Sequence, residues 1–415
     1  MSKRQFLKAL GPGLMWAGTA VGVSHLVQST RAGANYGFYF LGILVLANVI
    51  KYPFFEFAPR YAAATGQHLI DGYNRIGKWA VWLYAVLTFA TMFTIQAAVT
   101  IVTAGLLKNL LHIDLSTTAV SMILLAGIML ILLAGKFSTL DKLVKFIVLL
   151  LSLSVIVAVI SAFGHGFHPD YAKVRPFEWT NAPDIAFLIA FIGWMPAPID
   201  VAVWHSYWSV EKQRDTGYRP TLREALLDFN IGYVGTVLLA IGFLSLGALV
   251  MYGTGAHFAQ NGAKFAGQLV RLFTKTIGSW AYPVISIAAF TTMFSTTLTC
   301  LDAYSKVLKP TTEYLVPGWR TAKRGWTVWA WLFLVVTGAL LLIDVFASRM
   351  KVMVDIATTL SFVTAPFLAF LNYKAVTSKE IPGEYRPGKW MRLYAVTGIV
   401  FLTLFSLFYV LWRFA

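Results

Sequence analysis

Residues 191–200 read Phe-Ile-Gly-Trp-Met-Pro-Ala-Pro-Ile-Asp, so two prolines and an acid interrupt an otherwise apolar segment. Because Pro196 and Pro198 have no N–H group, the carbonyls of Ile192 and Trp194 lose their partners in a helix. An unpaired carbonyl inside a membrane is costly unless it lines a cavity or binds something. The stretch therefore predicts a discontinuous helix with a binding site at its break. A plain proline kink is the alternative.

Long apolar segments recur on both sides of this stretch. Of the 415 residues, 58% are hydrophobic and only 13% are charged, and the mean hydropathy is +0.68. One cysteine and 15% aromatic residues exclude a disulfide scaffold, a collagen-like fibre and a disordered chain. The composition predicts an all-α polytopic membrane protein.

Hydropathy predicts eleven membrane spans. They cover residues 11–30, 37–60, 79–107, 116–135, 139–163, 183–205, 226–252, 277–300, 325–346, 352–372 and 391–412.

The basic residues are unevenly divided between the connectors. The net charge is +16, and 23 of the 34 Lys and Arg residues fall on one side of the predicted spans. By the positive-inside rule this predicts a multi-pass protein of the cell membrane with a cytoplasmic N-terminus. Short connectors favour a prokaryotic inner membrane. A surface for nucleic acid is disfavoured because the basic residues are scattered over six segments.

The first predicted span is also irregular. Residues 18–25 read Gly-Thr-Ala-Val-Gly-Val-Ser-His, with two glycines, a serine and a histidine where an uninterrupted helix favours Leu or Ala. Spans one and six hold corresponding places in two halves of five spans, and span eleven follows. Interrupted segments at matching places indicate the binding site of a transporter.

Three ionisable residues inside spans are candidates for a proton or charge relay: Lys51, Glu56 and His205. Lys51 is expected to find an anion, and Asp200 is the candidate because it lies nearest to mid-membrane. Glu56 and Arg60 stand four residues apart and are expected to pair. The alternatives are a structural ion pair at Lys51 and a hydrogen-bonded core histidine at His205.

No Walker loop, His-Glu-x-x-His or Gly-x-Ser-x-Gly motif occurs, so we predict neither an enzyme nor a bound cofactor. Cys300 is the single cysteine, and its expected role is apolar packing. The hydroxyl-rich residues 291–299 either bond across helices or line a polar path.

Several stretches resemble the Nramp family of divalent metal transporters over most of the chain. The resemblance is carried by residues 11–13 (Gly-Pro-Gly), 32–37 (Ala-Gly-Ala-Asn-Tyr-Gly), 47–48 (Ala-Asn), 64–66 (Ala-Thr-Gly), 295–299 (Ser-Thr-Thr-Leu-Thr), 360–361 (Leu-Ser) and 366–367 (Pro-Phe). It implies a LeuT-type fold with two inverted five-helix repeats. These are expected at about residues 1–163 and 183–372, with an additional helix at 391–412.

The metal-binding motifs of the family are altered here. The Asp-Pro-Gly-Asn motif of span one falls on residues 22–25, Gly-Val-Ser-His, so that its Asp and Asn are absent. The family's span-three carboxylates are absent around residues 94–97, and its span-ten glutamine is Thr364. Losing the span-three acids argues against proton coupling of the family type.

The register of the family's Met-Pro-His motif in span six has two alternatives. Met195-Pro196 matches the Met-Pro pair directly. Matching His205 to a later family histidine instead places Pro198 at the methionine and Asp200 at the first histidine.

The resemblance implies a secondary transporter with alternating access, and we expect Mg²⁺ or Mn²⁺ as its substrate. Mg²⁺ keeps several waters and needs few protein ligands. The expected metal ligands are Asp200, His25 and Met195. The full expected substrate site comprises Thr19, Gly22, Ser24, His25, Met195, Pro198, Asp200 and Thr364.

Three other functions remain as alternatives. The first alternative is a transporter of the same fold that takes an organic or anionic solute, in which Lys51 replaces a coupling cation or pairs with a substrate carboxylate. The second is a receptor that does not transport, which is disfavoured because no signalling domain is expected in the sequence. The third is an intramembrane enzyme, which is disfavoured because the sequence shows no clustered nucleophile. The expected partners are a small ion or solute and the lipid bilayer.

Overall fold

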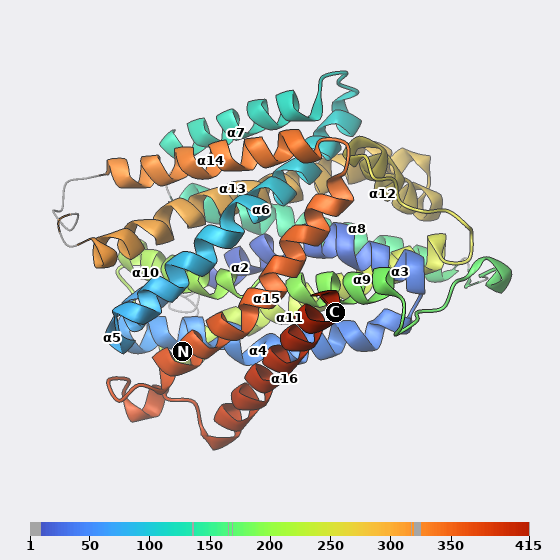
Figure 1. Cartoon of the computed structure of the whole chain (residues 1–415). Coiled ribbons are helices and arrows are strands. Elements are labelled where there is room, and N and C mark those ends of the chain that lie inside the picture. Colours follow the sequence, from blue (N-terminus) through green and yellow to red (C-terminus); the bar gives the residue numbers. More distant parts are fainter. Residues whose placement is uncertain are drawn as a thin grey trace.

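The computed structural model of the chain describes residues 10–134, 137–164, 166–167, 169–316, 318 and 325–414. Within these residues every regular element is a helix and no strand occurs (Figure 1). The predicted all-α class is confirmed. Seven basic residues of the charge count lie outside the described residues: Lys3, Arg4, Lys8, Lys136, Arg320, Lys323 and Arg324.

The helices of the first half are α2 (Pro12–Ala20), the π-helical turn η1 (Ser24–Ser29), α3 (Thr30–Tyr36), α4 (Tyr39–Thr65), α5 (Leu69–Ile76), α6 (Lys78–Leu111), α7 (Thr117–Ala134) and α8 (Phe137–Gly164). Those of the second half are the short turn η2 (Tyr171–Lys173), α9 (Ala182–Trp194), α10 (Asp200–Thr216), α11 (Leu222–Met251), α12 (Gly262–Ile277), η3 (Ser279–Ala281), α13 (Tyr282–Leu315), α14 (Trp326–Phe346), α15 (Met350–Thr377), η5 (Gly383–Tyr385) and α16 (Lys389–Phe414).

The long helices run between two ends of one bundle (Figure 1). By length and composition, seven helices of the described chain are able to cross a membrane: α4, α6, α11, α13, α14, α15 and α16. Helices α7 and α8 and two interrupted segments, α2–η1–α3 and α9–α10, complete the eleven predicted segments. We call the end where α2 begins the N-terminal end and the end where α3 stops the opposite end.

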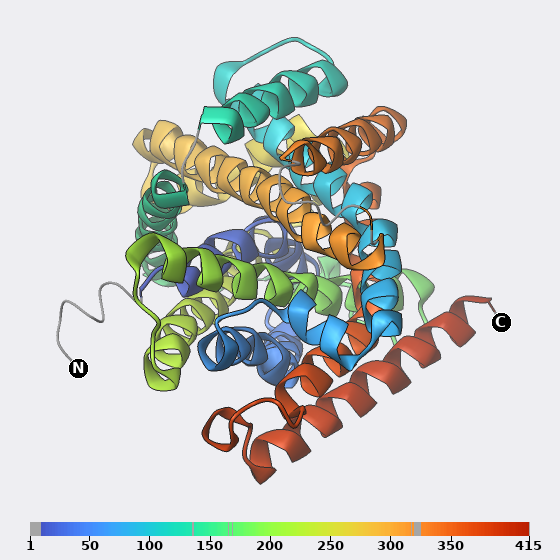
Figure 2. The same ribbon diagram turned by 90° about the vertical axis from the view of Figure 1, so that its left-hand side faces the viewer.

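Helices α14 and α16 lie at the periphery (Figure 2). Only 28% and 22% of their most apolar windows are buried, against 56% or more for the other five long helices. Their exposed residues include Leu341, Val345 and Leu411. An exposed apolar surface on a helix of this length is typical of contact with lipid tails. The chain is therefore a multi-pass membrane protein.

Hydropathy missed two short amphipathic helices, α5 and α12. Helix α12 buries Phe265 and Leu269 and exposes Lys264. Polar residues on one face lower the mean hydropathy of such a helix, so it does not resemble a span. Helix α13 extends fifteen residues beyond the predicted end at 300, to Leu315. Lys306 in this extension pairs with Asp302 at 3.1 Å and with Glu211 at 3.2 Å.

Glycines bring α11 against the first segment. A Cβ atom on Gly33 would lie 1.9 Å from the Leu244 carbonyl oxygen, and one on Gly247 would lie 2.2 Å from the Thr30 oxygen. The backbones therefore approach more closely than side chains permit, as in small-residue contacts between membrane helices. This contact places the first interrupted segment in the centre of the bundle (Figure 2).

We expect Gly33→Ala to destabilise the fold by about 1–3 kcal/mol, because α3 and α11 must separate. Gly235→Ala on α11 is the matched control, since a Cβ there meets nothing within 4 Å. That control should be neutral or stabilising by up to about 1 kcal/mol, as for other helical Gly→Ala changes. Thermal unfolding in detergent measures both. Equal unfolding temperatures for the two variants would contradict the contact.

Candidate functional site

The first segment is broken between α2 and η1. Helix α2 ends at Ala20, and the π-helical turn begins at Ser24. Gly22 within the break donates its N–H to the Ala20 carbonyl at 2.9 Å. A Cβ on Gly22 would lie 2.8 Å from the Thr296 methyl carbon, so only glycine fits beside α13 here. The interruption predicted for this segment is present.

The sixth segment is broken between α9 and α10. Residues 195–199 separate Trp194 from Asp200, and the Met195–Pro196 peptide bond is cis. The proline-rich stretch thus makes a discontinuous helix, as predicted, and leaves carbonyls at the C-terminal end of α9 that need donors.

Lys51 of α4 supplies those donors. Its ammonium donates to the carbonyl of Ile192 at 2.6 Å and to that of Gly193 at 2.7 Å. The side chain is completely buried. The predicted Lys51–Asp200 pair is wrong, because no carboxylate of the described chain lies within salt-bridge distance of Lys51. Backbone carbonyls at a helix C-terminus take the place of the expected anion.

The two breaks enclose a small cavity of about 20 Å³, room for roughly one water molecule. We call it the central cavity. Three predicted site residues line it: Thr19, Ser24 and Pro198. The rest of its lining comes from Ala20, Val23, Ile95, Val99, Trp194, Val201, Trp204, Thr296 and Cys300. Gly22, His25, Met195, Asp200 and Thr364 do not line it.

Cys300 and the two tryptophans are lining residues that sequence reasoning missed. Cys300 is buried and lies on α13, facing the same cavity as Thr296. Their spacing of four on one helix was the available signal, since i and i+4 share a face. No comparable signal marks Trp194 and Trp204, which flank the break on separate helices.

Asp200 opens helix α10 and is 1% exposed. Neither carboxylate oxygen has a hydrogen-bond partner within the described residues. The positive end of the α10 dipole favours a negative charge at this first position. An unpartnered buried carboxylate is expensive unless it takes up a proton or a cation.

The two histidines differ in their surroundings. His25 Nε2 donates to the Thr236 carbonyl at 2.9 Å, and Nδ1 lies 2.7 Å from the Ser24 hydroxyl. Metal ligation by His25 therefore requires these contacts to break. His205 is also buried, but neither of its ring nitrogens has a partner in the described chain. His205 packs instead beside Phe229, with ring centroids 5.7 Å apart.

Among the other predicted residues, Met195 and Thr364 are buried. The Thr364 hydroxyl donates within its own helix to the Ser361 carbonyl at 3.2 Å. Arg60 Nε donates to Glu56 Oε2 at 2.9 Å, which confirms the predicted pair. In the described part of the chain, no three His, Cys, Asp or Glu side chains stand close enough together to hold a metal ion.

A larger cavity of about 690 Å³ lies at the opposite end, and we call it the vestibule. Arg31 and Asp355 line it and pair twice, at 2.6 Å and 3.1 Å. Gln28 accepts from Arg31 at 2.8 Å, and the guanidinium lies 4.9 Å from the Phe187 ring centroid. Arg31 stands seven residues beyond Ser24 on the same interrupted segment, so one segment contributes to the linings of both cavities.

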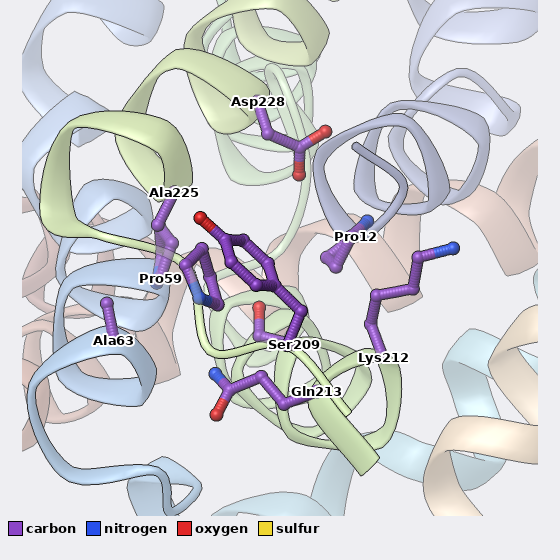
Figure 3. Close-up of a pocket in the computed structure, with 10 residues that line it drawn as sticks. Pro12, Pro59, Ala63, Ser209, Lys212, Gln213, Ala225 and Asp228 are labelled. Carbon is purple, nitrogen blue, oxygen red and sulfur yellow. The ribbon is translucent and has the colours of Figure 1, made fainter. Parts of the chain in front are cut away.

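The N-terminal end is closed by a contact between α11 and α2. Asp228 accepts the N–H of Gly11 at 3.0 Å and that of Gly13 at 2.6 Å, capping α2 from a neighbouring helix. Figure 3 shows the Asp228 carboxylate beside Pro12. The cavity lined there by Pro12, Ser209 and Asp228 measures only about 20 Å³.

We expect Asp228→Asn to cost about 1–3 kcal/mol of stability, because Gly11 and Gly13 bind different carboxylate oxygens and the amide replaces one of these with an NH₂ group that cannot accept. Thermal unfolding of the purified protein measures this loss. Asp215→Asn is the control, since Asp215 is exposed on α10. An unchanged unfolding temperature for Asp228→Asn would contradict the capping role.

Two interrupted helices enclosing a cavity inside a membrane-spanning bundle define the fold of a secondary transporter. A family model described as natural resistance-associated macrophage protein-like matches residues 13–412, and the chain belongs to this Nramp family. Its members are membrane transporters.

Relatives and solved structures agree with this assignment. The chain is 36% identical over 409 residues to an uncharacterised protein of Pasteurella multocida, covering 97% of this chain and 92% of that protein. It is 24% identical over 333 residues to the divalent metal cation transporter MntH of Brucella suis, covering 76% and 70%.

The fold is similar to that of the Eremococcus coleocola manganese transporter, with a TM-score of 0.73 at 16% identity over 98% of this chain and 86% of that one. It is also similar to MhsT in complex with L-phenylalanine, with a TM-score of 0.64 at 11% identity over 99% and 98%. These similarities confirm the predicted LeuT-type fold.

Proposed function

We propose that the protein moves a divalent metal ion, Mg²⁺ or Mn²⁺, across the cell membrane by alternating access around the breaks in its first and sixth segments. Family membership supports this substrate class, because the Brucella relative is named a divalent metal cation transporter. The N-terminal end faces the cytoplasm. The connectors at that end hold most of the described basic residues, as the positive-inside rule requires.

The unpartnered carboxylate of Asp200 carries this proposal. It follows two residues after Pro198, which lines the central cavity, and one residue before Val201, which also lines it. A small rotation at the break brings the carboxylate to the cavity. A cation arriving there gains a charged ligand that makes no competing hydrogen bond in the described chain.

The remaining ligands are few, which suits a partly hydrated ion. His25 and Met195 approach once His25 leaves the Thr236 carbonyl, and the hydroxyls of Thr19 and Ser24 bind through water. Glu56 stays paired with Arg60, whereas His205 lines the path to the cytoplasmic end.

A second candidate, an organic or anionic solute, is favoured by the charges of the vestibule. Arg31, Lys351 and Asp355 line it, and Lys173, Arg175 and Asp184 line the adjoining cavity of about 430 Å³. Four basic groups against two acidic ones attract anions and repel free divalent cations. The tryptophans of the central cavity also suit an apolar group.

A ligand panel separates the two candidates. Purified protein is heated with Mg²⁺, Mn²⁺, organic anions and zwitterions, and the rate at which a maleimide alkylates Cys300 is measured in parallel. Since Cys300 is the single cysteine and lines the central cavity, bound substrate should protect it. The metal proposal expects divalent ions to stabilise and protect. If an organic anion stabilises the protein and neither divalent ion does, the second candidate replaces the metal proposal.

A further inference from the structure

The C-terminal end of α9 has the features of a cation site. A helix leaves its last four carbonyls without intrahelical partners, and those dipoles sum to a partial negative charge. Here Pro196 and Pro198 prevent the chain from supplying the missing donors. Within the helix end itself, Met195 N–H reaches the Ile192 carbonyl only at 3.3 Å. In transporters with broken helices, such ends coordinate the coupling cation.

A lysine occupies this position here. The ammonium of Lys51 is held by two carbonyl oxygens, of Ile192 and Gly193, at 2.6 and 2.7 Å. It comes from α4, a continuous helix, and is fully buried. In the described chain no carboxylate neutralises it by a salt bridge, so the helix end is its counter-charge.

We propose that the C-terminal end of α9 is a cation site that the Lys51 ammonium fills permanently, so that transport takes no free Na⁺ or K⁺ at this break. The last clause rests on the proposed transport function, whereas the site itself is a property of the resting protein. Lys51 then acts as a positioning residue, which fixes the end of α9 against α4 while the solute binds elsewhere.

Three substitutions separate charge, volume and donor number. Lys51→Ala removes the ammonium and leaves space at the carbonyls. Lys51→Met fills a similar space without a charge or a donor. Lys51→Arg keeps both. Lys379→Ala, which removes an exposed lysine at the N-terminal end, is the control for general salt effects.

The test is thermal unfolding of the full chain in chloride salts of Na⁺, K⁺, methylammonium and choline at equal ionic strength. We expect Lys51→Ala to unfold about 5 °C lower in choline and to regain roughly half of that loss in methylammonium or K⁺. Lys51→Met should lose stability without recovery in any salt. Wild type, Lys51→Arg and Lys379→Ala should each have the same unfolding temperature in all four salts. The proposed cation site is wrong if Lys51→Ala lowers the unfolding temperature equally in every salt, or if methylammonium or K⁺ restores the unfolding temperature of Lys51→Met.

Wild-type protein supplies a second test that needs no folded variant. In proteoliposomes, uptake should proceed at the same rate when Na⁺ is replaced by choline on both sides. Stabilisation of wild type by Na⁺ over choline, or uptake that requires Na⁺, overturns the inference. If no solute is taken up, the proposed function fails, while the salt-dependent unfolding of Lys51→Ala still decides the site.

Discussion

Asp200→Asn is expected to weaken divalent-ion binding by about 100-fold or more, since it removes the charged ligand that we propose at the break. The same change should leave the ligand-free protein at least as stable as wild type. A buried carboxylate without a partner costs more free energy than a neutral amide of the same shape. Thermal unfolding with and without Mn²⁺ measures both effects.

Asp302→Asn gives the opposite pattern and serves as the control. Asp302 is buried too, but it pairs with Lys306 at 3.1 Å. Neutralising it should lower the stability of the ligand-free protein and leave the ion-induced shift unchanged. If Asp200→Asn keeps the full Mn²⁺ shift, Asp200 is not a ligand.

Arg31→Ala is expected to open the path from the vestibule to the central cavity. Removing one partner of a buried ion pair costs about 3–5 kcal/mol. The side chain of Asp355 is 36% exposed, so solvent screening reduces that effect. If about 1.4 kcal/mol of this cost falls on the closed state alone, the population of the state with an open path rises roughly tenfold. Alkylation of Cys300 by a membrane-impermeant thiol reagent added outside should accelerate by the same factor.

Lys173→Ala is the matched control, because Lys173 pairs with Asp170 at the same end but both side chains are about half exposed. It should leave the alkylation rate of Cys300 unchanged. Equal rates for Arg31→Ala and wild type would show that the Arg31–Asp355 pair does not close the path.

Hydropathy was enough to predict the eleven apolar segments, proline chemistry predicted the break in the sixth, and the glycines with Ser24 and His25 predicted the break in the first. Apolar length marks a span directly, and Pro196 and Pro198 cannot continue a helix. The extension of α13 was missed because Lys306 looks like the start of a connector. In the fold its charge is compensated by Asp302 of the same helix, α13, and by Glu211 of α10.

The surroundings of the site were less predictable. The partner of Lys51 is a pair of backbone carbonyls, and a carbonyl acceptor has no signature in the sequence. The contacts of His25 with Thr236, and of Arg31 with Asp355, join residues more than two hundred positions apart. Only the packing of the breaks against α11 and α15 brings these groups together.

We propose that this chain carries a divalent metal ion through the break beside Asp200. Uptake of Mn²⁺ and Mg²⁺ into proteoliposomes, compared between wild type, Asp200→Asn and empty vesicles over a range of pH, tests it most directly. We predict uptake by wild type well above empty vesicles, and its loss in Asp200→Asn. Wild-type uptake no greater than that of empty vesicles, for both ions at every pH, would show that the protein does not transport these ions.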